Sequence, residues 1–274
     1  MTEMMEVCNL RYNYPGHGRE VLRDLTIRIP KKKRTALCGH NGAGKSTLFM
    51  HMTGILQPEG GTVKWNGDPI SYRNKDLQLL RRRIGLVFQD PEQQLIMNTP
   101  YEDITYGLRN AFLPEDEIRM RSNQLLKLLN LEELADVPIH RLSLGQKKRV
   151  ALAGVMALEP ELLLLDEPAA YLDPVSEKLL MNELNRIHAE GVTIVMATHD
   201  MNIAYAWADW LCVLHQGKCV MEGTPFEIFE NAAYIKELGL ETPMLLEAWN
   251  ALPAVMREGK IPPRSLEEWK LAVG

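Results

Sequence analysis

The sequence predicts an α/β fold with a mostly parallel central sheet and an antiparallel β layer beside it. Apolar segments of strand length alternate with helical patterns along the chain, which is the order that builds parallel sheets. A glycine-rich loop stands between one such segment and the helix after it. The chain has 274 residues, of which 46% are apolar, so it can bury a proper core.

Two pairs of short strands should add antiparallel edges. Residues 7–14 and 21–29 are joined by the turn signal Pro15-Gly16-His17-Gly18, and together they predict the antiparallel layer. Near the other end, 211–214 and 219–221 flank a short turn. They predict a hairpin near the far edge of the central sheet.

The elements of the central sheet lie between these pairs. A helix from residue 45 should carry Leu48, Met52 and Ile55 inward, and a longer helical region should follow from 101 to about 131. The expected strands, in chain order, are 35–38, 84–88, 162–165 and 193–197.

The pattern changes near residue 236. We expect a main domain of residues 1–235 and a helical extension of residues 236–274, which four prolines break into short pieces. Trp249 and Trp269 should anchor the extension on the main domain or on a second copy. The helical stretches expected there are 244–252 and 265–272.

Charge and cysteine content narrow the functional classes. The net charge is −5, which argues against broad binding to nucleic acid, and the basic run Lys31-Lys32-Lys33-Arg34 is more typical of a solvated turn. The four cysteines form no C-x-x-C pair, so buried reduced thiols and a reducing cytosol are expected. No uncharged apolar run approaches the roughly 20 residues that span a bilayer, so other chains would supply any membrane part.

The glycine-rich loop predicts binding of a nucleoside triphosphate. Residues 39–46 fit the pattern G-x-x-x-x-G-K-[ST] and read Gly39-His40-Asn41-Gly42-Ala43-Gly44-Lys45-Ser46, followed by Thr47. The glycines let backbone N–H groups point at phosphate oxygens, and the next helix adds its positive end. Lys45 supplies a point charge, and Ser46 offers its hydroxyl to a Mg²⁺ ion that bridges the outer phosphates.

Two acids at a strand end predict the second half of this site. The run of leucines at 162–165 is followed by Asp166 and Glu167, which would emerge at the carboxyl edge of a parallel sheet beside the loop. Asp166 is placed to hold Mg²⁺ directly or through water. Glu167 is placed to polarise a water for in-line attack on the γ-phosphorus.

A third motif opens another helix. Ser143 and Gln146 have the spacing of an N-cap and its reciprocal partner, and an apolar stretch follows. The structural interpretation is a well-capped helix. However, its exposed N–H groups, the serine hydroxyl and the close approach allowed by Gly145 also make an anion site. It lies about a hundred residues after the first loop, so it need not serve the same nucleotide within one chain.

These segments together resemble the ATP-binding cassette (ABC) ATPase family over roughly residues 4 to 235. Ser143-Leu144-Gly145-Gln146 looks like the family's signature motif, which separates it from other phosphate-loop proteins. The resemblance implies that ATP with Mg²⁺ is bound and that a helical subdomain at about 90–158 carries the signature.

The resemblance also implies roles for residues at the edges of the site. Tyr14 matches the aromatic residue that stacks on adenine, and Tyr12 is a second candidate for that role. Asp173 matches the D-loop aspartate that crosses a dimer interface. The plainer interpretation of Tyr14 is a side chain that packs at a strand end.

Two further residues match family positions that contact the γ-phosphate region. Gln89 matches the Q-loop glutamine that senses the metal and the γ-phosphate, and His199 matches the switch histidine. A histidine between a strand and a helix could also simply cap the helix. The residues implied in catalysis are Lys45, Glu167 and His199, and those implied in holding Mg²⁺ are Ser46, Gln89 and Asp166.

The resemblance further implies a head-to-tail dimer that sandwiches two ATP molecules. Each ATP would lie between one chain's phosphate loop and the signature of the other chain, which is a copy or a paralogue. The physical reason is that a second helix N-terminus would complete the charge stabilisation around the γ-phosphate. Leu144 stands where glycine is more common in the signature, a change that related transport ATPases tolerate. Ala169-Ala170-Tyr171 also departs from the family pattern, which bears on coupling between the sites and not on ATP binding.

Part of the chain is similar to one group of transport ATPases. Residues 89–95, with Thr99, Glu102-Asp103 and Gly107, look like the energy-coupling factor (ECF) group of vitamin and metal importers. Within it the sequence most resembles the ATPase of cobalt importers, although nickel, biotin and riboflavin systems use similar ATPases. The resemblance implies a peripheral position on the cytoplasmic face of the cell membrane, with a membrane coupling subunit and a separate substrate-binding membrane subunit. Such a motor must pass its closing motion to membrane helices, so we expect residues 93–107, beside Gln89, to dock a helix of the coupling subunit. The plainer interpretation is that Ile96, Met97 and Tyr101 pack under the helical subdomain.

Two other classes are alternatives. Soluble ABC ATPases that work on nucleic acid or the ribosome usually carry a long coiled coil between the phosphate loop and the signature, or two cassettes, and the sequence has neither pattern. A phosphate-loop kinase would need an acceptor site and would lack the signature. No nucleic-acid partner is therefore expected.

Overall fold

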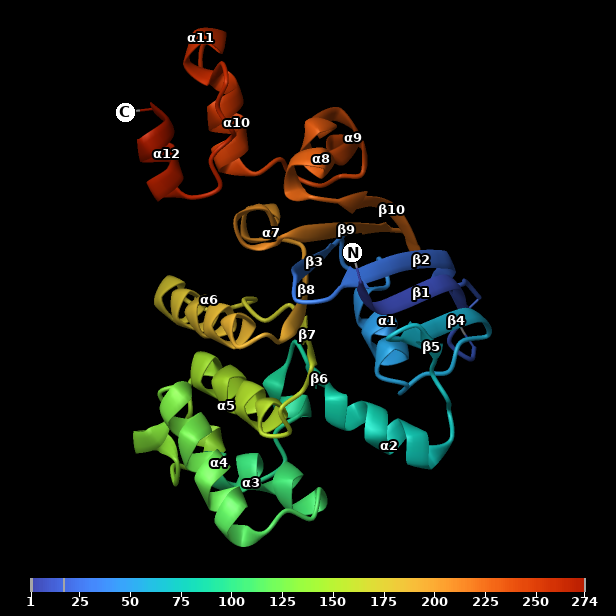
Figure 1. Ribbon diagram of the computed structural model, residues 1–274, viewed down its shortest axis with the longest axis vertical. Helices are drawn as coiled ribbons and strands as arrows, with labels where there is room; N and C mark the ends of the chain where they lie inside the picture. Colours follow the sequence, from blue (N-terminus) through green and yellow to red (C-terminus); the bar gives the residue numbers. More distant parts are fainter. Residues whose placement is uncertain (1, 17, 274) are drawn as a thin grey trace.

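Two β-sheets form the body of the protein, and the computed structural model describes residues 2–16 and 18–273 (Figure 1). The strands of the larger sheet are β3 (Arg34–Cys38), β6 (Ile84–Val87), β7 (Leu162–Asp166), β8 (Thr193–Thr198), β9 (Trp210–His215) and β10 (Lys218–Gly223). Their order is β10-β9-β3-β8-β7-β6, with β10 antiparallel to β9 and the other neighbours parallel. This order confirms the predicted parallel sheet and its edge hairpin.

The smaller sheet is antiparallel and has the order β2-β1-β4-β5. Its strands are β1 (Glu3–Tyr12), β2 (Leu22–Pro30), β4 (Gly60–Trp65) and β5 (Asp68–Pro69). The sequence predicts the first pair, but β4 and β5 are not foreseen. In β4 only Val63 and Trp65 are buried, so its apolar pattern is too short to indicate a strand.

The central strands divide their side chains between two cores. In β7, Leu162 and Leu164 face the core shared with the antiparallel sheet and helix α1 (Lys45–Met52). Leu163 and Leu165 face the opposite core, which most of the other helices cover. Because successive side chains of a strand alternate, a strand buried on both sides consists entirely of apolar residues. The polar residues that follow each strand are therefore placed at the edge of the sheet.

Helices cover both faces of the large sheet, and three of them form a separate group at the bottom of Figure 1. That group is α3 (Pro100–Asn110), α4 (Glu115–Leu128) and α5 (Leu144–Met156). The predicted helical region from 101 to about 131 is thus two helices, because Phe112 has a left-handed backbone and Pro114 follows it. The remaining helices before the tail are α2 (Asn74–Arg83), α6 (Pro174–Ala189), α7 (Met201–Trp207), α8 (Pro225–Glu230) and α9 (Ala232–Glu237).

Helix α1 ends earlier than the sequence predicts. Leu48 and Met52 are buried as expected, but Ile55 is 48% exposed, so its predicted inward position is wrong. The physical reason is Gly54, whose φ of +65 turns the chain out of the helix before Ile55 is reached.

The C-terminal tail folds back on its own chain. It contains α10 (Met244–Ala251), α11 (Ala254–Arg257) and α12 (Leu266–Val273). Trp249 is buried and meets the ring of Trp269 edge-on at 6.2 Å. Arg264 donates a hydrogen bond of 2.6 Å from Nε to the carbonyl oxygen of Tyr205. These contacts pack the tail against α7.

Two expectations about the whole chain can be compared with the structure. Cys38 and Cys212 are buried free thiols as predicted, but Cys8 and Cys219 are also free and only partly buried, so burial of all four is wrong. These two lie in β1 and β10 on faces that the sheets leave partly open. Within residues 2–16 and 18–273, no helix combines the length and apolar character needed to cross a bilayer.

Candidate functional site

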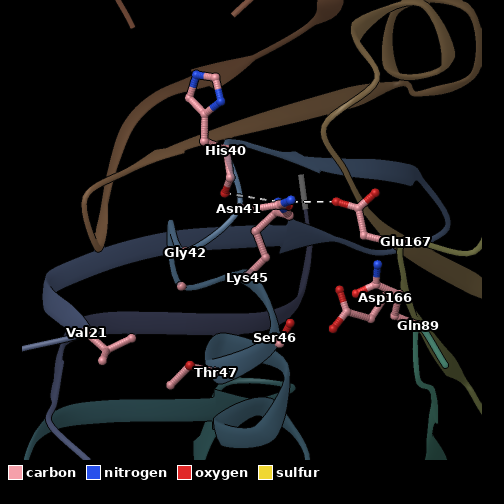
Figure 2. A pocket seen from close by; sticks show the side chains of 11 residues that line it. Val21, His40, Asn41, Gly42, Lys45, Ser46, Thr47, Gln89, Asp166 and Glu167 are labelled. Carbon is pink, nitrogen blue, oxygen red and sulfur yellow. Dashed lines mark hydrogen bonds and ion pairs between the residues drawn. The ribbon is translucent and has the colours of Figure 1, made fainter. Parts of the chain in front are cut away.

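The glycine-rich loop joins the carboxyl end of β3 to the first turn of α1 (Figure 2). Gly39 has a φ of +152, and a Cβ there would lie 2.4 Å from the carbonyl oxygen of Leu214. Gly44 has a φ of +103, and a Cβ there would come within 2.7 Å of the Leu22 side chain. Only glycine fits at these two positions, so the loop lies directly against β9 and β2.

A cavity of about 250 Å³ opens beside this loop. Strands β3, β6 and β7 are parallel, so the residues that follow their carboxyl ends meet at one edge of the sheet. The structure therefore brings most of the predicted nucleotide-binding residues to one place, as Figure 2 shows. The cavity is lined by Val21, His40, Asn41, Gly42, Gly44, Lys45, Ser46, Thr47, Gln89, Asp166 and Glu167.

Lys45 is a buried cation at the centre of this site. Its ammonium donates a hydrogen bond of 2.6 Å to the carbonyl oxygen of Gly39 and lies 3.3 Å from Oε1 of Glu167. Both side chains are only 6% exposed, so the pair is largely removed from water. A buried charge needs such partners, and triphosphate oxygens could replace them.

The side chains of Glu167 and His199 are in contact because each residue follows one of two adjacent strands. Glu167 follows β7 and His199 follows β8, and Oε2 of the glutamate lies 2.8 Å from Nδ1 of the histidine. The histidine side chain is 56% exposed, whereas the carboxylate is buried. The arrangement presents a fixed carboxylate to the cavity, with a solvent-accessible imidazole behind it.

Asp166, Ser46 and Gln89 supply oxygen atoms that suit a magnesium ion. Burial raises the pKa of Asp166, while a hydrogen bond with Ser46 opposes that shift by favouring the charged form. A carboxylate, a hydroxyl and an amide oxygen are ligands that Mg²⁺ accepts. In the described chain, no cluster of three His, Cys, Asp or Glu side chains could hold a metal.

The two tyrosines considered for adenine stacking differ in exposure. The Tyr12 ring is buried against Tyr14 at 5.1 Å and His51 at 4.6 Å, so it has little free face. Tyr14 is half-buried, and its hydroxyl lies 3.2 Å from the Thr47 hydroxyl. The stacking role of Tyr14 stays a prediction, and its position beside the first turn of α1 is compatible with it.

The signature residues form the start of α5, as the capping pattern predicts. The Ser143 hydroxyl accepts a hydrogen bond from the Gln146 N–H, and the Gln146 side chain accepts one from the Ser143 N–H at 2.8 Å. Leu144 and Gly145 follow in the first turn. These residues are not among those that line the described cavity of their own chain.

Asp173 caps α6, the helix that follows β7 in the chain. Its carboxylate accepts hydrogen bonds from the N–H groups of Val175 and Ser176, both at 3.0 Å, and from the Ser176 hydroxyl at 2.6 Å. The hydroxyl contact is the main cause that lowers the pKa of Asp173. Asp173 therefore has a structural role in α6, and its role at a dimer interface stays a prediction.

The structure adds contacts that the sequence did not indicate. The Nε2 atom of His40 lies 3.1 Å from the carbonyl oxygen of Leu238, which links the phosphate loop to the segment after α9. Lys148 on α5 contacts the turn after Glu167. No local pattern signals such pairs, because each joins segments far apart in the chain.

A phosphate loop after β3, a buried lysine, and two acids at the end of β7, a parallel strand separated from β3 by β8, define a phosphate-loop nucleotide-binding protein. The family model described as "ABC transporter" matches residues 22–170. This chain belongs to that family of ABC transporter ATPases, as the sequence resemblance implies.

Similar proteins narrow the class further. The chain is 48% identical to a putative ABC transporter ATP-binding protein of Nostoc sp., over 86% of each chain. It is 42% identical to the energy-coupling factor transporter ATP-binding protein EcfA3 of Clostridium perfringens, over 88% of this chain and 85% of that one. The solved structure of CbiO1 from Clostridium perfringens, part of the ABC transporter complex CbiONQ, has a TM-score of 0.77 and 42% identity, and the match covers 87% of this chain and 95% of CbiO1. The chain is an ATPase of the ECF transporter type.

Proposed function

We propose that this chain is the motor subunit of an ECF importer for a metal ion, with cobalt as the transported ion. The observation that supports the proposed mechanism most is the 3.3 Å ion pair between Lys45 and Glu167 at one cavity, because the mechanism needs a cation for the phosphates and a carboxylate for the water. The metal assignment is supported by the similarity to CbiO1 and by the sequence resemblance to cobalt importer ATPases. Nickel, biotin and riboflavin are the competing substrates.

Glu167 acts as the general base in the proposed reaction. A water molecule gives a proton to Glu167 while its oxygen bonds to the γ-phosphorus, and the bond from that phosphorus to the β–γ bridging oxygen breaks. ADP leaves with the bonding electron pair, and the proton returns to solvent. Lys45 offsets the negative charge on the phosphate oxygens, and His199 orients the carboxylate.

Mg²⁺ would bind together with ATP and supply further charge compensation to the phosphates. Ser46, Asp166 and Gln89 would hold it, with Asp166 acting directly or through water. A few protein oxygens are enough to hold Mg²⁺, because this ion usually keeps several water and phosphate ligands.

The signature supports a head-to-tail dimer. Ser143 is exposed at the start of α5, so the helix N-terminus is available to another molecule. In the proposed sandwich, residues 143–146 of a second copy or a paralogue complete the site beside Lys45. Asp173 would lie at this dimer interface.

A second cavity, of about 260 Å³, supports docking of a membrane subunit at residues 93–107. Gln94, Ile96, Asp103 and Tyr106 border it, and Ile96 is 61% exposed. The Asp103 carboxylate accepts hydrogen bonds from the N–H groups of Ile96 and Met97, which fixes this loop. Such a groove between the sheet and α3 suits a helix of the coupling subunit, which would place the ATPase peripherally on the cytoplasmic face of the membrane.

Capture from native membranes tests this assignment. Tagged Glu167→Gln chain, held with ATP, is purified from detergent-solubilised membranes, and the accompanying chains are identified by mass spectrometry. We expect helical membrane proteins of an importer. Recovery of ribosomes or nucleic-acid factors without a membrane chain would overturn the transport role and leave the ATPase intact.

Uptake measurements test the substrate. Cells that carry the natural chain should accumulate radioactive cobalt, and cells that carry Glu167→Gln should not. Parallel assays with nickel, biotin and riboflavin identify the solute if cobalt uptake is the same in both strains.

A further inference from the structure

Lys148 is a buried lysine outside the nucleotide cavity. It lies on α5, two residues after Gln146, and is 3% exposed. Its ammonium donates hydrogen bonds to the carbonyl oxygens of Glu167, Pro168 and Ala170 at 3.2, 2.9 and 2.8 Å. An ammonium carries three donor hydrogens, so these three carbonyls can use all of them.

The carbonyls belong to a turn whose backbone needs support. Glu167 has a φ of +48 and Tyr171 a φ of +63, and residues with side chains adopt this left-handed backbone at an energetic cost. The carbonyl of Glu167 also accepts the Ala170 N–H at 3.1 Å. Lys148 therefore helps to fix the peptide that carries the catalytic carboxylate.

The lysine stays largely charged near neutral pH. Burial lowers the pKa of Lys148 to about 8, while the negative charges of Glu167 and Asp90 act in the opposite direction. The three hydrogen bonds to carbonyl oxygens favour the charged form as well. At pH 7, below this pKa, the ammonium form with all three donors therefore predominates.

A second contact joins the same two segments. A Cβ at Gly145 would lie 2.9 Å from the Ser176 hydroxyl, so the first turn of α5 packs directly on the first turn of α6. Asp173 caps α6 through Ser176 and ends the turn that Lys148 holds. Helix α5 is thus tied to both ends of the turn formed by residues 167–173.

We infer that Lys148 is a positioning residue that couples the two ATP sites of the dimer by fixing Glu167 to the signature helix. The inference rests on the sandwich dimer of the proposed function. In that dimer, the signature of one chain contacts the nucleotide held by its partner, whereas Glu167 of the same chain acts on the chain's own nucleotide. When the signature at the start of α5 contacts the partner's nucleotide, α5 shifts. Lys148 then moves the Glu167 peptide with α5, because hydrogen bonds from an ammonium are short and strong.

The test compares ATP hydrolysis by the full chain and by Lys148→Met, which keeps a long apolar side chain but has no donor. We expect kcat to fall at least about tenfold, since small misplacements of a catalytic group are costly. The Hill coefficient for ATP should fall toward 1. The Kd for the fluorescent analogue TNP-ATP should stay within about threefold, because Lys148 does not line the described cavity.

Two further variants separate positioning from general stability. Lys148→Arg keeps a charged donor group and should restore most of the turnover and the cooperativity. Lys147→Met, the matched control, changes the neighbouring lysine, whose ammonium pairs with Glu92. We expect this variant to have the kcat, Hill coefficient and TNP-ATP Kd of the natural chain. If Lys148→Met does not fold, Lys148→Gln, which keeps two donors, takes its place with the same measurements.

Natural kcat and Hill coefficient in a folded Lys148→Met or Lys148→Gln chain would overturn the coupling role. Size-exclusion chromatography of Glu167→Gln with ATP tests separately whether the chain forms the sandwich dimer. A chain that stays monomeric there contradicts the sandwich. A chain that dimerises, with unaltered cooperativity in the Lys148 variants, contradicts only the coupling.

Discussion

The Glu167 carboxylate is held by His199, whose Nδ1 lies 2.8 Å from Oε2 of the glutamate. An ionised carboxylate only accepts hydrogen bonds, so Nδ1 must carry the proton and donate it. Lys45 contacts the other oxygen of the same group at 3.3 Å. In the proposed mechanism, the lysine is drawn to a triphosphate and His199 remains as the group that orients Glu167, the proposed general base.

His199→Ala should therefore slow hydrolysis more than it weakens binding. We expect at least about a tenfold loss of kcat, typical of removing an orienting partner of a general base, with ATP affinity within about threefold of the natural value. Phosphate release and TNP-ATP titration measure the two quantities. His188→Ala, which removes an imidazole whose only hydrogen bond to the described residues is with the Val192 carbonyl, is the control. Natural turnover in His199→Ala would contradict the orienting role.

Lys45→Ala should lose phosphate-dependent binding. Removing charge-assisted hydrogen bonds to phosphate should weaken ATP affinity by roughly tenfold to a hundredfold, and it also leaves Glu167 without its cation. Isothermal titration with ATP and with adenosine separates the phosphate contribution, since adenosine binding should change little. Unchanged ATP affinity would contradict the phosphate-loop assignment.

Gly39→Ala should distort the phosphate loop, because its Cβ would lie 2.4 Å from the Leu214 carbonyl oxygen. We expect a loss of about 2 kcal/mol or more in the free energy of unfolding, together with weaker ATP binding. Gly67→Ala is the matched control, since Gly67 also has a positive φ but its Cβ would meet open space. That variant should lose only about 1 kcal/mol. Equal losses in both urea titrations would mean that the contact with Leu214 is unimportant.

His51 should make the protein less stable in mild acid. Burial lowers the pKa of His51 to about 4 from 6.5, although a backbone contact with Leu56 opposes the shift. Between these pH values the unfolded chain takes up a proton that the folded chain refuses, so the free energy of unfolding falls as the pH falls, by up to about 3 kcal/mol.

His51→Met should lack this part of the pH dependence, because methionine fills similar space and does not titrate. Urea denaturation at several pH values between 7.5 and 4.5 measures the slope for both chains. Replacement of the exposed His140 controls for the loss of one imidazole. A His51→Met chain that loses stability with acid as steeply as the natural chain would contradict the assignment.

The parts of the fold that depend on local patterns were predictable. The leucines of β7 indicate a strand buried on both sides, and the acids after them indicate the edge of the sheet where the site lies. Spacing alone also indicated the capping of α5 by Ser143 and Gln146. In each case the physical determinant lies within a few residues of sequence.

The remainder depends on contacts between distant segments. Nothing near Lys148 in the sequence indicates that its ammonium reaches the carbonyl of Glu167. In the same way, nothing near His40 indicates that its imidazole contacts the carbonyl of Leu238. Ile55 was misplaced because the helical period continues past Gly54, while the backbone does not. The division of the chain at residue 235 and the helical subdomain at about 90–158 stay predictions.

Turnover and dimerisation of Glu167→Gln test the central claim most directly. An amide cannot take the proton from water, so we expect hydrolysis at least about a hundredfold slower, with ATP binding retained and an ATP-dependent dimer that persists on size-exclusion chromatography. Glu161→Gln, which alters a surface carboxylate paired with Arg83, should behave like the natural chain. Near-natural hydrolysis by Glu167→Gln would contradict its role as general base, and with it the proposed mechanism.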